Sequence, residues 1–179
     1  MRLPDAINPS PDPPTLHTER ASPADLPLLI ALKDACVAQM RAQGIDQWDD
    51  VYPSVALFQA DVAAGTVQVA RADRALLGAF TLDARLDPLW EGMDWQPPAG
   101  PVAAVHRLMV HPAQQGHGLG RQLMARAEAL AKQMGFCALR LDAFTANPAA
   151  LALYDRLGYR RTGSAQMRKG PFVCFEKLL

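Results

Sequence analysis

A mixed α/β fold, in which helices pack on both faces of one sheet, is predicted by the order of the local patterns. Strand and helix patterns alternate in the second half of the chain, and two strands joined by a turn end it. Alternating elements bury their apolar faces best as layers around a sheet. Half of the residues are hydrophobic, and 179 residues suit one compact domain. We expect that domain to cover residues 15–179.

The first half is expected to hold two helices and three strands after a disordered leader. Residues 1–14 contain five prolines and little to bury. Ser22, which precedes a proline, and Ser54 are typical of helix starts, and Gly44 and Gly65 fit helix ends. The expected elements are a strand at 16–20, helices at 22–44 and 54–65, and strands at 66–71 and 75–82.

The second half follows a long loop at 83–101, which is rich in proline and glycine. Loops of this length in compact domains are either functional or disordered. The expected elements are a strand at 103–110, a helix at 118–134, a strand at 138–143, a helix at 148–157, and a hairpin of 159–168 with 172–177. One face of the first of these helices is predicted to be buried through Leu119, Leu123, Ala127, Leu130 and Met134.

Composition excludes several classes of partner. Eighteen Lys and Arg balance eighteen Asp and Glu, so no long-range field favours nucleic acid or an anionic membrane. Apolar stretches are too short to span a bilayer, and the N-terminus lacks a signal peptide's apolar region. Three widely spaced cysteines, Cys36, Cys137 and Cys174, indicate reduced core thiols in a cytoplasmic protein. No histidine or cysteine spacing indicates a metal site.

The most informative segment is a turn with glycines at alternate positions, Gly116, Gly118 and Gly120, between a strand and an amphipathic helix. Glycine allows a positive φ and a close approach of the backbone to a ligand. The free amides and dipole of a helix N-terminus suit an anion such as a pyrophosphate. The spacing is not that of a P-loop, and Arg121 stands where a dinucleotide fingerprint needs glycine, so a dinucleotide reductase is excluded.

Two motifs carry a resemblance to a known family. Gln115-x-x-Gly118-x-Gly120 resembles the acetyl-CoA signature of the GNAT superfamily of N-acetyltransferases, Gln/Arg-x-x-Gly-x-Gly/Ala. The stretch from Asn147 through Tyr154 to Gly158-Tyr159 is similar to that family's second signature. The resemblance extends by element order over residues 15–178 and is strongest over 102–159. It implies a mostly antiparallel central sheet of six to seven strands, acetyl-CoA as co-substrate, and no metal.

The resemblance also implies a set of cofactor contacts. The backbone of Leu108, Met109 and Val110 would pair with the pantetheine arm as an added strand. Asn147 would hydrogen-bond the pantetheine near the thioester. The residues implied for the diphosphate are those of the glycine turn, namely Gln115, Gly116, His117, Gly118, Leu119, Gly120 and Arg121.

Acetyl transfer to an amine requires a neutral amine, a stabilised oxyanion and a proton for the departing thiolate. By the resemblance, the Val110 N–H would meet the oxyanion. Tyr154 would protonate the CoA sulfur and would also contact the cofactor. The alternative for Tyr154 is a core aromatic residue on a helix face.

Two residues are candidates for the base. Asp142 lies on the strand before the second motif, where some family members carry a glutamate. Because Asp is shorter, a water relay is favoured over direct proton abstraction. The alternative is a structural partner for Arg140 or Arg107. The other candidate is His106, because a histidine side chain in general titrates near ~6.5, which suits a base at neutral pH. Its alternative is a hydrogen-bonded histidine within the sheet.

The acceptor site is expected outside the two motifs, in segments that are less characteristic of the family. Phe172, in the last hairpin, is a candidate substrate-binding residue that would line the pocket, and its alternative is packing within the sheet. Trp48, Tyr52 and Trp90 are the other candidates, since aromatic rings near aspartates are able to hold a cationic amine by cation–π contact and charge. The alternative is that these aromatic residues anchor loops beside solvated acids.

Two functions remain after this reading. One is a cytoplasmic N-acetyltransferase that moves the acetyl group of acetyl-CoA to a primary amine of a small molecule or peptide, by direct attack in a ternary complex. The other is a catalytically silent acyl-CoA-binding or sensor module, which needs the glycine turn but no acid or base. Family members often dimerise, so a homodimer is among the expectations.

Overall fold

The computed structural model describes residues 17–179. The leader expected over residues 1–14, and the first residue of the strand expected at 16–20, lie outside the described residues. The strands are β1 His17–Arg20, β2 Val67–Ala72, β3 Ala75–Asp83, β4 Val102–Val110, β5 Ala138–Phe144, β6 Arg160–Met167 and β7 Gly170–Leu178. The helices are α1 Leu26–Ala42, α2 Val55–Ala63, α3 Leu119–Gln133 and α4 Pro148–Arg156, with short 3₁₀ turns at Pro23–Asp25, Pro88–Trp90 and Pro112–Gln114.

These elements confirm the expected fold. Seven strands form one sheet in the order β1-β2-β3-β4-β5-β7-β6. Every neighbouring pair is antiparallel except β4 and β5, which run parallel. Helix starts and ends also agree with the sequence, since Ser54 Oγ caps α2 by accepting from the amide of Leu57, and Gly44 and Gly65 adopt positive φ after α1 and α2.

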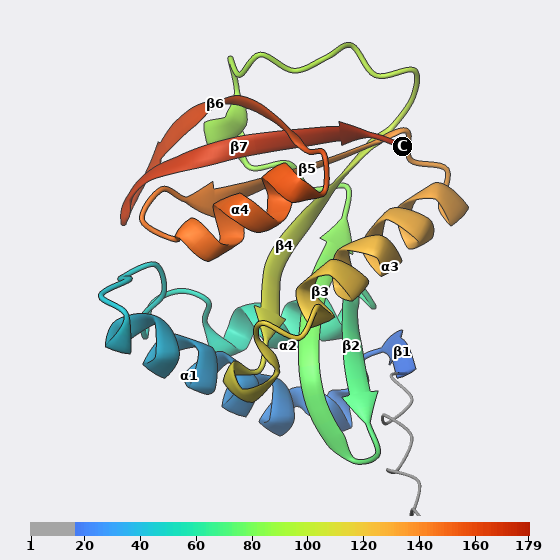
Figure 1. The fold of residues 1–179 in the computed structure, drawn as a ribbon. Coiled ribbons are helices and arrows are strands. Elements are labelled where there is room, and N and C mark those ends of the chain that lie inside the picture. The colour runs from blue at the N-terminus through green and yellow to red at the C-terminus, as the bar shows by residue number, and fades with distance from the viewer. Residues whose placement is uncertain (1–16) are drawn as a thin grey trace, which may run out of the picture.

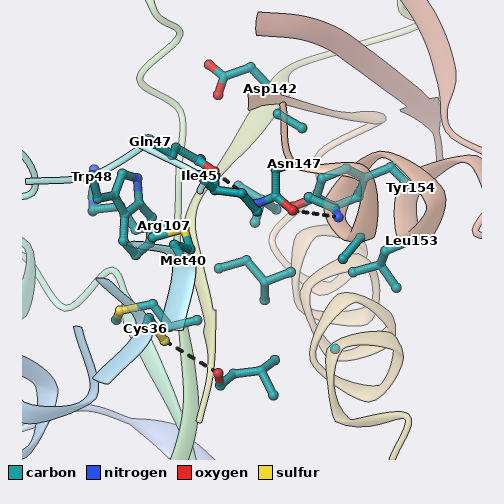
Figure 2. Close-up of a pocket in the computed structure, with 18 of the residues that line it drawn as sticks. Cys36, Met40, Ile45, Gln47, Trp48, Arg107, Asp142, Asn147, Leu153 and Tyr154 are labelled. Carbon is teal, nitrogen blue, oxygen red and sulfur yellow. Dashed lines mark hydrogen bonds between the residues drawn. The ribbon is translucent and has the colours of Figure 1, made fainter. Parts of the chain in front are cut away.

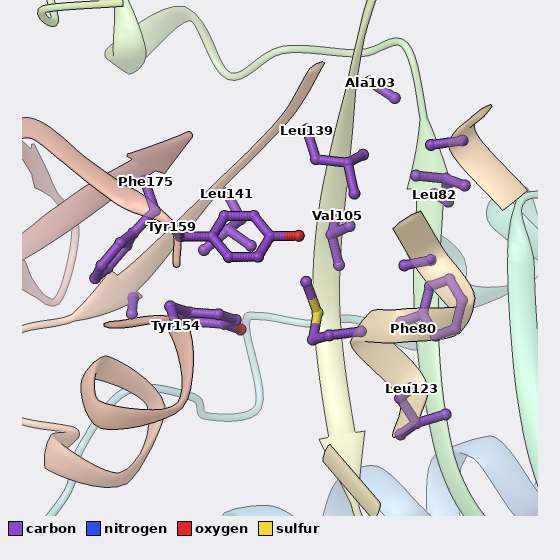
Figure 3. Packing of buried hydrophobic residues seen from close by; sticks show 14 of the residues in the cluster. Phe80, Leu82, Ala103, Val105, Leu123, Leu139, Leu141, Tyr154, Tyr159 and Phe175 are labelled. Carbon is purple, nitrogen blue, oxygen red and sulfur yellow. The ribbon is translucent and has the colours of Figure 1, made fainter. Parts of the chain in front are cut away.

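Helices cover both faces of the sheet (Figure 1). α3 and α4 pack on one face, over a core of strand residues such as Phe80, Leu139 and Leu141 (Figure 3). α1 and α2 pack on the other, over Val69 and Ala79 among others. Neighbouring residues of β3 therefore enter opposite cores, as the period of two in a strand requires.

One predicted core position is wrong. Met134 follows the last residue of α3 and is 54% exposed, because the helix ends before this side chain reaches the sheet. Met124 and Ala131 are fully buried on this helix instead. No helix within residues 17–179 combines the length and apolar character needed to cross a membrane.

A bulge in β4 opens the sheet at its centre. β4 places Arg107 and Leu108 opposite the single residue Phe80 of β3, and Arg107 has a φ of 49°. An extra residue in the left-handed region bends a strand and increases its twist. β4 accordingly pairs with β5 only at residues 102–104, and the two strands diverge beyond that point (Figure 1).

The bulge is held by a buried ion pair that the sequence did not indicate. Asp61 of α2 is fully buried and accepts hydrogen bonds from the guanidinium groups of Arg107 and Arg85. Arg85 also binds Asp83 at the end of β3. A carboxylate between two guanidinium groups keeps its charge satisfied without water, so α2 is tied to the bend of β4.

We expect Asp61→Ala to destabilise the protein by about 3–5 kcal/mol, because the substitution leaves the buried Arg107 guanidinium without its carboxylate. Urea denaturation followed by circular dichroism measures this loss. Asp155→Ala is the matched control, since the Asp155–Arg161 pair lies at the surface and exposed pairs contribute little. Equal losses in both variants would contradict a special role for Asp61.

Candidate active site

A cleft of about 1410 Å³ runs along the diverging half of β4. Its walls come from α1, the loop after α1, the glycine turn, α3, α4 and the β6–β7 turn. Figure 2 shows Asn147 and Tyr154 on one side of this cleft and Gln47, Ile45 and Trp48 on the other. The loss of pairing between two central strands therefore creates a hollow with free backbone groups on its floor.

Val110 directs its backbone into the cleft. The His111 amide donates to the carbonyl of Leu77 at 2.8 Å, and Gly78 lies opposite Val110. Bonded and non-bonded positions alternate along an antiparallel pair, so Val110 turns its N–H and C=O away from β3. Its carbonyl accepts from Gln115 Nε2 at 3.1 Å, which ties the first residue of the glycine motif to the end of β4.

Met109 does not share this orientation. It lies opposite Ala79 at a bonded position of the β3–β4 pair, and its side chain is buried against α1 and α2. Of the three residues expected to offer their backbone to the pantetheine arm, Leu108 and Val110 are the two whose groups are not used by β3.

The glycine turn has the geometry that its sequence predicts. Gly116 and Gly118 have φ values of 81° and 84°, in the region that L side chains rarely adopt. Gly118 is the N-cap of α3 and supplies no side chain, so the first amides of the helix remain unpaired. A side chain at Gly120 would meet Leu153 of α4 at 3.4 Å. The turn thus presents bare amides close to α4, as an anion site requires.

Tyr154 fits both descriptions weighed for it. Its ring packs edge-on against Tyr159 and beside Phe175 in the core (Figure 3), and the residue also lines the cleft. Burial raises the pKa of the Tyr154 phenol, and the charge of Asp142 raises it further. The phenol therefore keeps its proton at neutral pH, as a proton donor must.

Asp142 and His106 both lie against one aromatic side chain, that of Trp90. The indole N–H of Trp90 donates to Asp142 Oδ2 at 2.9 Å. The His106 ring stacks on Trp90 with 6.0 Å between ring centroids and 12° between planes. Trp90 is 3% exposed and is absent from the lining of the cleft, so it touches the two candidate bases from behind rather than facing a substrate.

Asp142 does not form the ion pair with Arg140 or Arg107 that a purely structural role would involve. Arg140 binds Glu176 and Arg107 binds Asp61, so neither arginine pairs with Asp142. Burial raises the pKa of the Asp142 carboxyl to about 6, although the Trp90 N–H and nearby His106 lower it. A carboxylate with this pKa is ionised at neutral pH and is a stronger base than an exposed one.

His106 uses one of its nitrogens within the structure. Nε2 lies 3.0 Å from the carbonyl oxygen of Arg85 and 3.5 Å from Asp83 Oδ1. Both neighbours are acceptors, so Nε2 carries the proton, and only Nδ1 remains to accept another. This matches the alternative of a histidine bonded within the sheet, although His106 also lines the cleft.

Asn147 joins α4 to the loop after α1. Its Oδ1 caps α4 by accepting from the Ala150 amide at 3.2 Å, and its Nδ2 donates to Gln47 Oε1 at 3.0 Å. The structure therefore engages this side chain from both sides. Gln47 did not stand out in the sequence, since a single glutamine in a loop carries no spacing signal.

The remaining acceptor candidates meet at the end of the cleft away from α3. Trp48, Tyr52 and Phe172 line it, and the Trp48 and Phe172 rings are largely buried. Asp46 and Asp49, beside Trp48, are not available for a cationic amine, because Arg168 binds Asp49 and Lys169 binds both Asp46 and Asp49. Asp94 in the long loop is likewise bound, by Arg160. Asp50 is exposed and does not line the cleft. Two acids do line the cleft, Asp142 and Asp87, and the sequence did not single out Asp87.

The described residues contain no cluster of three His, Cys, Asp or Glu side chains that would hold a metal ion. All three cysteines are free, and Cys36 and Cys174 are buried. Cys36 lines the cleft and its Sγ donates to the Val110 carbonyl at 3.4 Å (Figure 2). Burial raises the pKa of the Cys36 thiol to about 11, so this thiol is not a nucleophile at neutral pH.

Comparison with known proteins agrees with this geometry. Residues 30–159 match the model of the acetyltransferase (GNAT) family. Mycothiol acetyltransferase of Kocuria rhizophila is 45% identical over 60 residues, which are 34% of this chain and 20% of that protein. N-alpha-acetyltransferase 40 of Saccharomyces cerevisiae is 34% identical over 120 residues, 62% of this chain and 42% of that protein. The chain thus spans less than half the length of either relative.

Solved structures share the fold. The PaiA N-acetyltransferase of Thermoplasma acidophilum, determined in complex with coenzyme A, superposes with a TM-score of 0.71 at 19% identity. The superposition covers 92% of this chain and 99% of the PaiA chain. The family match extends over more than half of the chain and includes the glycine turn, β5 and α4. The chain belongs to the GNAT family of acetyltransferases.

Proposed function

We propose that this acetyltransferase transfers the acetyl group of acetyl-CoA to a primary amine of a small molecule or peptide, by direct attack in a ternary complex. The observation that carries the proposal is the cleft itself. It connects the bare amides of the glycine turn to Tyr154 and Asp142 along the unpaired edge of β4. The names of N-alpha-acetyltransferase 40 and PaiA N-acetyltransferase support transfer to nitrogen.

The residues of the cleft fit acetyl-CoA. The first amides of α3 would hold its diphosphate, where the helix dipole favours negative charge. The backbone of Leu108 and Val110 would pair with the amides of its pantetheine arm. Asn147 would turn its side chain from Gln47 toward that arm. When bound, acetyl-CoA supplies the acetyl group and leaves as the free thiol.

Three groups of the chain would serve the transfer. Asp142 takes a proton from the amine, directly or through a water molecule, so that the nitrogen lone pair is free to attack. The Val110 N–H meets the charge that develops on the acetyl oxygen. Tyr154 gives its proton to the sulfur as the carbon–sulfur bond breaks. Overall, one N–C bond replaces one C–S bond. The nitrogen of an ammonium substrate loses two protons: one is released to solvent through Asp142, and the other balances, through solvent, the proton that Tyr154 gives to the thiol.

We also propose that residues 15–179 form a single domain and that the protein acts in the cytoplasm. The described residues form one sheet with cores on both faces. Three free thiols suit a reducing compartment. The silent-module alternative finds less support, because a binding module has no need of a carboxylate with a raised pKa and a buried phenol at the same cleft.

A thiol-release assay with acetyl-CoA and a panel of amines tests the proposal. We expect free CoA to appear with some amines and not in their absence. Tight binding of acetyl-CoA with no release on any amine would favour the silent module instead.

Tyr154→Phe is expected to lower kcat by about 100-fold and to leave the Kd of acetyl-CoA nearly unchanged. The phenyl ring preserves the packing against Tyr159 and Phe175, so only the proton donor is lost. Steady-state kinetics and calorimetry separate the two effects. Full turnover in the variant across the pH range would remove Tyr154 from the mechanism.

Trp90→Phe is expected to move the acidic limb of the kcat/KM profile upward by about one pH unit. Asp142 must be ionised to act, so activity falls as pH drops through its pKa near 6. Loss of the indole N–H removes a hydrogen bond to the charged form and raises that pKa.

Trp95→Phe is the matched control for this profile. Trp95 lies in the same loop and packs against Trp90, but its N–H donates to the Trp90 carbonyl instead of a titrating group. We expect the limb to stay in place in this variant. An unmoved limb in Trp90→Phe would show that another group is the base.

A further inference from the structure

The cations at the acceptor end of the cleft are all paired. Arg107 binds buried Asp61. Arg168 binds Asp49 through both terminal guanidinium nitrogens, Nη1 and Nη2, at 2.9 and 2.8 Å, and Lys169 Nζ lies 2.8 Å from carboxylate oxygens of Asp46 and Asp49. Each of these cations, in the described part of this end, therefore already has a carboxylate as counter-ion, and a carboxylate or phosphate on the acceptor would have to compete for it.

The other two arginines that line the cleft belong to its cofactor end. Arg121 lies in the first turn of α3, beside the glycine turn. Arg156 ends α4, roughly 13 Å along the helix from Asn147 at a rise of about 1.5 Å per residue. Both are therefore placed for the phosphates of the cofactor rather than for the acceptor.

Two carboxylates at the acceptor end have no cationic partner among residues 17–179. Asp87 Oδ1 accepts from the Leu89 amide at 2.8 Å, and Asp142 accepts from the Trp90 indole. Neither takes part in an ion pair with Lys or Arg. The charge of Asp87 raises the pKa of Asp142, so the two carboxylates interact electrostatically, and both line the cleft.

Several apolar side chains also line the acceptor end, beside the uncharged polar side chains of Gln43 and Gln47. Val51 and Leu89 are 67% and 52% exposed at its mouth. The apolar residues that line this end are Met40, Ile45, Trp48, Val51, Leu89 and Phe172. An amine with an apolar body would bury these surfaces on binding.

We infer that the acceptor is an amine with an apolar group beside the nitrogen and no carboxylate on the adjoining carbon, and that Asp87 and Asp142 exclude free amino acids. The inference rests on the proposed function and names the substrate class of the same site. An α-carboxylate would be desolvated next to two negative charges, where each nearby cation already has a counter-ion. An amide, or a peptide bond at an N-terminus, carries no such charge.

L-Leucine and L-leucinamide form a matched pair that tests this inference. They share the side chain and the α-amine and differ only in the carboxylate. The kcat/KM of each is measured by thiol release with acetyl-CoA and divided by the neutral-amine fraction, which titration of each compound supplies. We expect leucinamide to be favoured by about tenfold or more after this correction.

Asp87→Asn tests which residue is responsible. Asparagine keeps an oxygen to cap the Leu89 amide, so the loop is preserved while one negative charge is lost. We expect the leucinamide-to-leucine ratio to fall by about threefold or more. Glu91→Gln removes the same charge from the same loop at an exposed position outside the cleft, and its ratio should equal that of the unsubstituted protein.

The outcomes distinguish a failure of the proposed function from a failure of the inferred acceptor class. If no amine in the panel is acetylated, the proposed function fails. If amines are acetylated but leucine equals leucinamide after correction, the proposed function stands and this inference is overturned. A ratio that falls equally in both variants would assign the selectivity to general charge rather than to Asp87. If Asp87→Asn does not fold, as circular dichroism would reveal, the ratio for the unsubstituted protein decides the inference alone.

Discussion

The loss of pairing between β4 and β5 beyond residue 104 is the constraint on which the site depends. A continuous sheet would satisfy the backbone of Val110 with a neighbouring strand and leave nothing for a ligand. The bulge at Arg107 bends β4 away, and the buried Asp61 holds that arginine in place. A salt bridge beneath one face of the sheet thus maintains an opening at its centre.

The opening brings together groups that serve different purposes. At one end, the glycine turn contributes bare amides because Gly118 starts α3 without a side-chain cap. Beyond it, Tyr154 and Asp142 have raised pKa values for the same reason, burial. The phenol therefore stays protonated, and the carboxylate becomes a stronger base than an exposed one.

The long loop after β3 contributes more through its buried residues than through its exposed ones. Trp90 supports Asp142 by a hydrogen bond and His106 by stacking, and it makes no contact with the cleft itself. Asp87, three residues earlier, faces the cleft without a cationic partner. The same turn of chain thus orients the candidate bases and gives the acceptor end its negative charge.

The sequence by itself determined the order of the elements, the glycine turn and the motif that holds Asn147 and Tyr154, because these depend on local spacing and on φ values that only glycine adopts readily. It also determined the family resemblance that the comparison confirmed. Only the tertiary structure decided which charges remain unpaired. Asp46, Asp49 and Asp94 lie beside aromatic residues in the sequence, yet each meets a cation from a distant strand or turn, whereas Asp87, which the sequence did not single out, has no such partner among the described residues. Trp90 was expected to line the acceptor site, but the structure places it behind Asp142 and His106. The sequence could not indicate this, because these partners are distant in sequence and such contacts carry no periodic signal.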